Sequence, residues 1–402
     1  MRLPTLEDLG PVDRGRVFVR LDLNVPLEDG AVADDARIRA SLPTLTELLE
    51  RRAAIVAASH LGRPKGRVDD SARMGPVAER LGDLLERPVR YLRADGVLNP
   101  DVEAACRTLE QGEIALLENL RFDPGEEAND PVFAEGLAGL AGPYVDDAFG
   151  AAHRAHASVD ALPGLVRGRA DAAVAGRLLQ REVDALSKLR RDPARPYVAM
   201  LGGAKVSDKL GTIGALVEQV DALLVGGAMA FTFIAAEGGS VGDSLVEAER
   251  FDDVRAARKR ADERGVVVQV PEDVVSAPAV AADAPRRTVP ATEIPPGEKG
   301  LDIGPRTVEE FARTIADAKT ILWNGPMGVF ELEPFSAGTR GVATAIAGAS
   351  AYSVAGGGDS LAAISRYGLA EGFDHLSTGG GASLEFLEGR ELPGLQALRV
   401  TT

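Results

Sequence analysis

The chain has 402 residues, more than one hydrophobic core usually organises, so two domains of roughly 150 to 200 residues each are expected. The formal net charge of −16 argues against a general nucleic-acid or membrane-surface binder, because such proteins need a broad basic face. Cys106 is the single cysteine, which excludes an internal disulfide framework and a multi-cysteine metal site and indicates a reducing compartment such as the cytoplasm.

Short apolar runs, each followed by a helix-like amphipathic segment, predict two parallel sheets wrapped by helices. The first series of runs lies at 16–25, 53–60, 113–120 and 143–149. The second series lies at 195–203, 221–227, 266–274, 320–326, 351–358 and 374–381. Strand–helix alternation of this kind predicts an α/β protein. The expected fold class is therefore two doubly wound parallel-sheet (Rossmann-like) domains facing across a cleft.

Two further segments are predicted from their composition. Residues 171–189 have apolar residues at helical spacing and are expected to form one helix that leads out of the first domain. The Pro- and Ala-rich stretch 277–297 is expected to be surface loop. No apolar run of signal-peptide type and no uninterrupted apolar stretch of about 18 residues occurs, so neither secretion nor a membrane partner is expected.

Polar and basic residues follow the strands of the first domain, where ligands bind in open α/β sheets. The two-residue strand period places Arg20, Asp22 and Asn24 on one side of the first strand. The other candidates are Arg37, His60, Arg63, Arg121, His153 and Arg154. Each arginine alone is most simply a solvated surface group, and His156 and His375 are most simply core groups. Four predicted strands are each followed by an arginine, although the chain as a whole is acidic. This pattern indicates a site for a small, highly anionic substrate.

The stretch LGGAKVSDKL (201–210) opens the second series with glycines and lysines. Gly202 and Gly203 allow close backbone approach after a strand. Lys205 and Lys209 are four residues apart, on one face near the amino end of a predicted helix, where the helix dipole favours anions. An ordinary exposed pair of lysines on a helix is the alternative.

The later strands of the second series end in glycine-rich turns before helices. Backbone N–H groups in such turns, at 356–358 and 379–381, can form anion nests. Asp359 is either a helix N-cap or a ligand for the Mg²⁺ that accompanies nucleotide phosphates. Asn324 follows a strand, and Glu331 is placed to reach ribose hydroxyls. The P-loop pattern and the dinucleotide fingerprint are both missing, so a nucleotide must be held in another way.

Ten motifs, in order along nearly the whole chain, resemble the phosphoglycerate kinases. They are RLDLNVP, DDARIRA, SHLGRP, LLENLRF, AFGAAHRAHAS, LGGAKVSDK, LDIGPRT, WNGPMGVFE, GGGDS and STGGGASLEFLEG. The resemblance implies a two-domain kinase that moves a phosphoryl group between 1,3-bisphosphoglycerate and ADP, giving 3-phosphoglycerate and ATP. It also implies Mg²⁺ bound with ADP or ATP, small-molecule substrates, a monomer and a cytoplasmic location.

The resemblance also implies roles for individual residues, by motif position. The triose would be held in the amino-terminal domain by Asp22, Leu23, Asn24, Arg37, His60, Leu61, Gly62, Arg63, Arg121 and Arg154. The nucleotide would be held in the other domain by Gly203, Lys205, Lys209, Gly300, Asn324, Pro326, Glu331, Gly357, Gly358, Asp359 and Ser360. Arg37, Lys205 and Lys209 would be catalytic, and Asp359 would hold the metal.

In this family the carboxyl-terminal segment crosses back to the first domain. The implied domains are residues 1–170 with the returning residues 383–402, the interdomain helix 171–189, and residues 190–382, with closure about the helix and the segment near 377–383. Four residues depart from the family pattern: Asp123, Asp146, Ala228 and Asp243. None of the four replaces a residue to which chemistry is assigned.

Two other classes of protein fit the strand–helix alternation. A nicotinamide-dependent dehydrogenase would have two doubly wound domains, but the missing fingerprint counts against it. A binding protein that keeps the fold without activity is the second, and intact Arg37, Lys205 and Asp359 argue against it.

Overall fold

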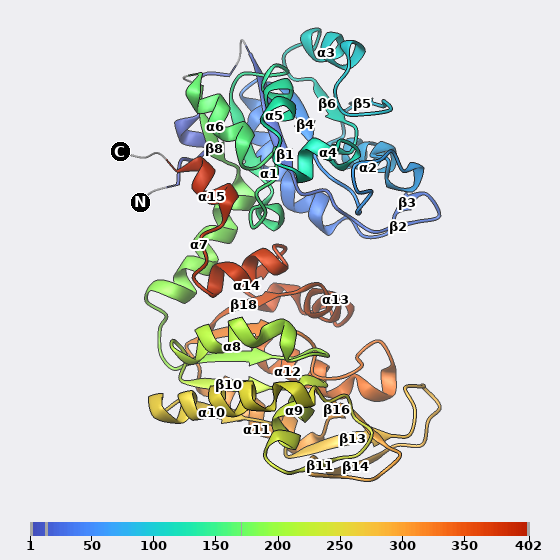
Figure 1. Ribbon diagram of the computed structural model, residues 1–402, viewed down its shortest axis with the longest axis vertical. Coiled ribbons are helices and arrows are strands. Elements are labelled where there is room, and N and C mark those ends of the chain that lie inside the picture. The colour runs from blue at the N-terminus through green and yellow to red at the C-terminus, as the bar shows by residue number, and fades with distance from the viewer. Residues whose placement is uncertain (1–2, 13–14, 170, 400–402) are drawn as a thin grey trace. The chain divides into compact units, whose positions relative to one another are not determined.

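The computed structural model describes residues 3–12, 15–169 and 171–399, which form two compact α/β units (Figure 1). Unit 1 comprises the residues up to Asp184 together with those from Glu391 onward, and unit 2 comprises Ala185–Arg390. The ends of the predicted domains at 1–2, 170 and 400–402 lie outside the described residues. Among the helices that are described, none is both long and apolar enough to cross a membrane.

Unit 1 is built on a six-stranded parallel sheet with the order β5-β6-β4-β1-β7-β8. Its strands are β1 (Arg16–Leu21), β4 (Ala54–Ala58), β5 (Val89–Leu92), β6 (Ile114–Leu117), β7 (Tyr144–Asp147) and β8 (Ala173–Ala175). Its helices are α1 (Ala36–Glu50), α2 (Gly75–Leu85), α3 (Pro100–Arg107), α4 (Pro124–Glu127), α5 (Pro131–Ala138), α6 (Ala161–Gly168) and α15 (Pro393–Leu398). A hairpin of β2 (Leu27–Glu28) and β3 (Ala31–Val32) follows β1.

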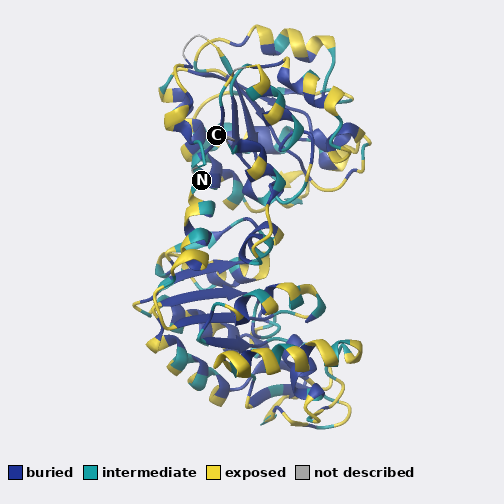
Figure 2. Cartoon of the chain, turned by 60° about the vertical axis from the view of Figure 1, so that its left-hand side comes forward, coloured by how far each residue is buried: buried dark blue, intermediate teal, exposed yellow. Residues whose placement is uncertain are grey.

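The two faces of β1 show how the strand period positions unit 1's polar residues. Val17, Val19 and Leu21 join one core cluster, and Phe18 lies on the opposite face, where its ring stacks on Tyr144 at 6.0 Å between centroids. The central strands are buried along nearly their whole length, as Figure 2 shows in dark blue. A ligand can therefore approach these strands only at their ends.

Unit 2 is built on a second six-stranded parallel sheet, with the order β12-β10-β9-β17-β18-β19. Its strands are β9 (Tyr197–Leu201), β10 (Ala222–Val225), β12 (Val267–Gln269), β17 (Thr320–Asn324), β18 (Tyr352–Gly356) and β19 (His375–Ser377). Its helices are α8 (Leu210–Val217), α9 (Met229–Ala236), α10 (Phe251–Arg264), α11 (Pro305–Asp317), α12 (Ala337–Ala347), α13 (Gly358–Arg366) and α14 (Gly381–Leu387). Two small sheets pair β11 (Ser240–Val241) with β15 (Glu293–Ile294), and β13 (Asp273–Ala277) with β14 (Arg287–Pro290) and β16 (Lys299–Ile303).

Short 3₁₀ helices occupy several turns of both units. They are η1 (Leu6–Asp8), η2 (Asp70–Ala72), η3 (Leu120–Phe122), η4 (Phe149–Ala151), η5 (Ser207–Lys209), η6 (Ala248–Arg250), η7 (Glu333–Phe335) and η8 (Ala370–Gly372). Three of them, η3, η4 and η5, come shortly after strands of the large sheets. Arg121 lies in η3 and Lys209 in η5, and Arg154 follows η4.

The structure corrects two predictions of secondary structure. The helix expected over 171–189 is α7 (Arg177–Arg191), because residues Ala173–Ala175 pair in parallel with β7 and form the edge strand β8. The stretch 277–297 is not wholly loop, since it contains β14 and β15. Both errors have one cause: strands of two to four residues are too short to show a period.

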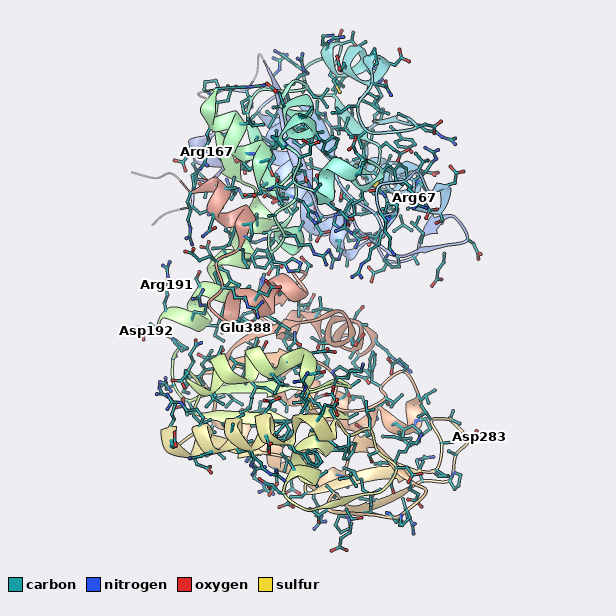
Figure 3. All side chains as sticks on the ribbon, in the orientation of Figure 1. Arg67, Arg167, Arg191, Asp192, Asp283 and Glu388 are labelled. Carbon is teal, nitrogen blue, oxygen red and sulfur yellow. The ribbon has the colours of Figure 1, made fainter. Side chains whose placement is uncertain are left out.

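The carboxyl-terminal segment belongs to both units in turn. In unit 2, Glu388 accepts a hydrogen bond from Thr212 Oγ1 (2.8 Å), which fastens the end of α14 to α8 (Figure 3). In unit 1, Arg167 Nη1 donates to the carbonyl of Arg399 (2.6 Å), which fastens the residues after α15 to α6. The segment therefore joins unit 1 at Glu391, later than the expected residue 383, and α14 stays with unit 2.

Candidate functional site

In unit 1 the carboxyl ends of β1 and β7 mark a switch in strand order. The chain places β4 on one side of β1 and later β7 on the other, so the connections after β1 and β7 leave toward opposite sides. Ligands of open α/β sheets bind at such switch points. Asp22 directly follows β1, Asn24 comes two residues later, and Arg154 follows β7 and η4, so these predicted residues lie where a ligand is expected.

An ion pair forms at this switch point. Arg37, in the first turn of α1, donates from Nη1 to Oδ2 of Asp22, whose side chain is only 4% exposed. A Cβ at position 150 would collide with the same Asp22 oxygen, so a larger residue in η4 would displace this carboxylate. Asp22 Oδ1 is buried and has no hydrogen-bond partner among the described residues. The ion pair therefore positions the half-buried guanidinium of Arg37 at the carboxyl ends of the strands. Asp22 Oδ1 lies beside it as a further hydrogen-bond acceptor.

The loop after β4 is fixed by two asparagines. Asn119 accepts from the N–H of Leu61 (3.2 Å) and donates to the Leu61 carbonyl (2.7 Å). Asn24 accepts from the N–H of Gly62 (2.8 Å), a residue with φ of +62°. Arg121 donates to the Gly62 carbonyl (2.7 Å). Asn119 was not predicted as a site residue, although its place in LLENLRF beside Arg121 was the available signal.

His60 is buried and neutral. Burial lowers its pKa well below 6.5, and the charges of Arg20 and Arg121 lower it further. His156 behaves in the same way, with a pKa lowered to about 4 by burial and by Arg121. His60 and His156 are therefore uncharged hydrogen-bonding groups, and the nearby positive charge is carried by arginine.

The remaining predicted residues of unit 1 differ in exposure. Arg63 follows β4 and is exposed, while Arg154 follows β7, is half-buried and donates to His153 Nε2 (3.3 Å). Arg121 is buried, lies 3.5 Å from a Glu127 oxygen, and has its pKa lowered to about 10 by burial. Leu23 is fully buried in the core, so its contribution to a ligand site is limited to backbone groups.

In unit 2 the switch point lies between β9 and β17, and glycines let the two following loops touch. The N–H of Gly202 donates to the carbonyl of Asn324 (3.0 Å), and the N–H of Gly203 donates to that of Pro326 (3.0 Å). A Cβ at Gly202 would collide with the Pro326 carbonyl, and Gly325 has φ of +99°. The predicted close approach of the glycine pair is therefore confirmed, and its partner is the loop after β17.

The two lysines lie in different environments. Lys209 Nζ donates to the carbonyl of Asn324 (2.8 Å) and to its Oδ1, and burial lowers the Lys209 pKa to about 8 against the opposing effect of Asp359. Lys205 is exposed. The prediction that both project from one helix is wrong, because α8 begins only at Leu210 and Ser207 is held in η5 by two hydrogen bonds to Glu247 (3.0 and 2.6 Å).

A cavity of about 490 Å³ opens beside these loops in unit 2. Five predicted residues line it: Gly203, Gly300, Pro326, Glu331 and Asp359. Most of the other wall is apolar and was not predicted: Ala204, Gly227, Phe231, Leu245, Val274, Val280, Leu301, Met327 and Val329. Apolar walls with a few polar groups are typical of small-molecule sites of this volume.

Two of the four departures from the family pattern also face this cavity. Ala228 and Asp243 belong to its wall, together with Lys299. Asp243 accepts from the N–H of Gly297 (3.2 Å), which ties the β11 end to the loop before β16. A Cβ at Gly300 would collide with the ring of Phe231, so this glycine leaves room for the aromatic side chain at the wall.

The glycine-rich turn before α13 brings Asn324, Gly357 and Ser360 together. Ser360 is fully buried and accepts from the N–H of Gly325 (2.7 Å), so it shapes the loop after β17. Gly357 has φ of +91°, and a Cβ there would lie 3.1 Å from Asn324 Nδ2. Gly358 and Asp359 are exposed at the amino end of α13, where Asp359 faces the cavity.

The carboxylates of the described residues do not form a metal centre of their own. No group of three or more His, Cys, Asp or Glu side chains that could hold a metal ion occurs among them. Asp359 is a single exposed carboxylate at the cavity. A divalent cation here would need further ligands from a bound molecule or from water.

Comparison with known proteins gives matches over nearly the whole chain. A family model described as phosphoglycerate kinase matches residues 6–390. The phosphoglycerate kinase of Thermomicrobium roseum is 54% identical over 98% of both chains, and that of Roseiflexus castenholzii is 52% identical over 95% of this chain and 96% of its own. The solved structure of phosphoglycerate kinase from Coxiella burnetii is 39% identical, with a TM-score of 0.86 over 99% of both chains. The similarity spans both units.

Proposed function

The chain belongs to the phosphoglycerate kinase family, and from this membership we propose how its residues divide the reaction. That reaction is the reversible transfer of a phosphoryl group between 1,3-bisphosphoglycerate and ADP, which gives 3-phosphoglycerate and ATP in glycolysis. We assign the triose to unit 1 and the nucleotide to unit 2. The assignment depends chiefly on the contrast between an arginine-rich sheet edge in unit 1 and a largely apolar cavity of about 490 Å³ in unit 2. A coupled assay of Mg-ATP-dependent phosphorylation of 3-phosphoglycerate tests the activity itself.

The unit 1 residues suit a small substrate that carries phosphate and carboxylate. Arg63, Arg121 and Arg154 each follow a strand of one sheet, and the planar fork of arginine binds both anions bidentately. The unpaired Oδ1 of Asp22 offers an acceptor for a substrate hydroxyl. His60 would supply a neutral hydrogen bond. Together these groups match a phosphorylated hydroxy acid.

The unit 2 cavity suits a purine nucleotide. Phe231, Leu245 and Met327 supply apolar surface for a base, and Glu331 supplies an acceptor for ribose hydroxyls. Backbone N–H groups near Gly203 and at the start of α13 lie where phosphates would be bound. Asp243 and Ala228 stand at the same wall, so these two departures from the family pattern would bear on the nucleotide, whereas Asp123 and Asp146 belong to unit 1.

Phosphoryl transfer requires little more than correct positioning of the two substrates and positive charge near the moving phosphoryl group. An oxygen of ADP that is already anionic attacks the acyl phosphate, and a carboxylate leaves, so no general base is required. We assign Lys205 to the oxygens of the moving phosphoryl group, Lys209 to a nucleotide phosphate, and Arg37 to the transferring group from the triose side. Lys209 keeps a pKa of about 8, so it is mostly charged near neutral pH.

Asp359 fits a magnesium ion that is bound together with ADP or ATP. It is an exposed carboxylate facing the cavity, and Mg²⁺ commonly takes one or two carboxylates together with phosphate and water oxygens. When bound, the ion would neutralise phosphate charge. The absence of a three-ligand cluster among the described side chains agrees with an ion that arrives with its nucleotide.

We expect Arg63→Ala and Arg121→Ala to raise the KM for 3-phosphoglycerate by about 10- to 100-fold with a smaller change in kcat, because these guanidinium groups would bind the non-reacting end of the substrate in ground and transition states alike. Arg107→Ala is the matched control, since Arg107 is an exposed arginine of the same unit that pairs with Glu103 on α3. Steady-state kinetics with each substrate varied would check this. A raised KM for ATP with an unchanged KM for the triose would reverse the assignment of the two units.

We also propose that binding of both substrates brings the two units together. In-line transfer needs the attacking oxygen within about 3 to 3.5 Å of phosphorus, with water excluded, yet the ligands are assigned to different units. Small-angle scattering should show a smaller radius of gyration with 3-phosphoglycerate and a non-hydrolysable ATP analogue than without ligand. The same radius of gyration at proven saturation would contradict closure.

A monomeric state and a cytoplasmic location stay predictions from the sequence. Cys106, the one cysteine, is a buried free thiol, which suits a reducing compartment. Size-exclusion chromatography with light scattering would test the oligomeric state.

A further inference from the structure

A buried chain of hydrogen bonds leads from Glu126, in α4, to His60 at the end of β4. The carboxylate of Glu126 accepts from both the N–H (2.9 Å) and the Oγ (2.6 Å) of Ser158. Arg20 Nε donates to the same Ser158 Oγ (2.8 Å), and Arg20 Nη2 lies 3.1 Å from His60 Nδ1. Glu126 and Ser158 are fully buried, and Arg20 is 1% exposed.

The chemistry of these groups fixes the direction of each bond. A guanidinium can only donate, so His60 Nδ1 is the acceptor and carries no proton. The Ser158 hydroxyl gives its hydrogen to Glu126, because a carboxylate only accepts, and this leaves a lone pair of Oγ for Arg20. A neutral His60 with a bare Nδ1 must have its proton on Nε2.

Several charged groups surround Arg20 and His60. Asp146 is the neighbour of Arg20 across the β1 and β7 register, and burial raises the pKa of Asp146 to about 6. The pKa of His60 is lowered by three further groups, Arg121, Arg37 and His156. Glu126 is joined to the guanidinium of Arg20 by a continuous hydrogen-bonded path through Ser158, whereas Asp146 accepts from the N–H of Ala148 (3.0 Å).

We propose that Glu126 is a positioning residue of the triose site, which acts through Ser158 and Arg20 to hold His60 in the Nε2–H tautomer and so presents a neutral N–H donor to the substrate. This rests on the proposed function, in which His60 binds the triose. Glu126 itself touches no substrate in this scheme. Its carboxylate orders the guanidinium, and the guanidinium selects the tautomer.

The test uses the full chain labelled with ¹⁵N in histidine and the variants Glu126→Gln and Ser158→Ala. The chain has four histidines, and the His60 signals are those missing from His60→Asn. Long-range ¹H–¹⁵N correlation should show Nε2–H for His60 in the parent and a mixture of tautomers in both variants. The KM for 3-phosphoglycerate should rise about fivefold or more, with the KM for ATP unchanged.

Asp273→Asn in unit 2 is the matched control. Asp273 is 1% exposed and accepts from Thr307 N and Oγ1 (both 2.8 Å), so the variant disturbs an equally buried carboxylate far along the chain. We expect it to lower thermal stability while the His60 signals and the triose KM stay as in the parent. If these two readings changed as much as in Glu126→Gln, the change would be a general loss of stability and the proposal would be overturned.

An Nδ1–H parent spectrum would overturn the proposal, as would variants that keep both the tautomer and the triose KM. Ser158→Ala retains the buried charge of Glu126, so it answers the question if Glu126→Gln does not fold. The ¹H–¹⁵N spectra report the His60 tautomer without catalysis, so they do not depend on the activity of a variant. Loss of the proposed function would appear as an inactive parent enzyme, whereas failure of the positioning role would appear as unchanged His60 spectra in variants of an active one.

Discussion

Lys205→Ala is expected to lower kcat by about 10²- to 10³-fold and to leave nucleotide binding nearly intact, as when one donor to a developing charge is removed. The side chain of Lys205 is exposed, in the turn before η5. A compact ammonium group with this freedom can follow a phosphoryl oxygen as it moves between two anions. Single-turnover kinetics would measure the fall in the rate of phosphoryl transfer. Nucleotide titration would show whether the affinity for the nucleotide is retained.

Two further variants make the Lys205 test specific. Lys259→Ala removes an exposed lysine from α10 and should leave kcat unchanged. Lys205→Arg retains the charge but replaces a rotatable point charge by a planar fork, so we expect a partial loss of kcat. If kcat of Lys205→Ala stayed within a few-fold of the parent, Lys205 would have no role in transfer.

Arg37→Ala is expected to produce the second large effect, a fall in kcat of about 10²-fold or more, because in the proposed assignment it would remove positive charge from the transferring group on the triose side. Arg37 is held at the sheet edge by its ion pair with Asp22 and remains about one-third exposed, so its guanidinium is both oriented and accessible. Initial rates in both directions of the reaction would measure the loss.

Arg39→Ala is the matched control for Arg37, from the same helix. Arg39 is more exposed and pairs with Asp35 (2.8 Å), so its loss should leave kcat unchanged. Thermal unfolding of Arg37→Ala shows how much stability is lost when Asp22 loses its partner. Equal kinetic changes in the two variants, or a change confined to KM for the triose, would refute the assignment of Arg37 to the transition state.

The sequence predicted the strands of both large sheets best where they are buried and apolar. The runs at 16–25, 195–203 and 320–326 contain β1, β9 and β17, three of the four strands that flank the two switch points. These runs are recognisable because a buried parallel strand is nearly continuous in apolar residues. Polar residues placed directly after them were therefore correctly located at the sheet edges.

The parts that sequence reasoning missed depend on contacts between distant segments. Leu245 and Val280 line the unit 2 cavity, yet both lie in loops, and the short apolar stretches around them show no period of a helix or strand. The late start of α8 depends on the bonds from Ser207 to Glu247, forty positions away. Asn119 holds the loop after β4 through contacts that only the fold creates.

The late attachment of the carboxyl-terminal segment to unit 1 matters for synthesis on the ribosome. Unit 2 is one unbroken stretch of chain, whereas unit 1 lacks α15 until the residues after Glu391 have been made. Leu395 and Leu398 of α15 are buried, and the N–H of Gly394 donates to the carbonyl of Ala152 (2.9 Å). At ordinary elongation rates the synthesis of unit 2 takes about 10 s or more, and only then is α15, the last helix of unit 1, translated. The unit that is synthesised first is thus the last to be completed, and the apolar surface that α15 covers stays exposed until the end of synthesis.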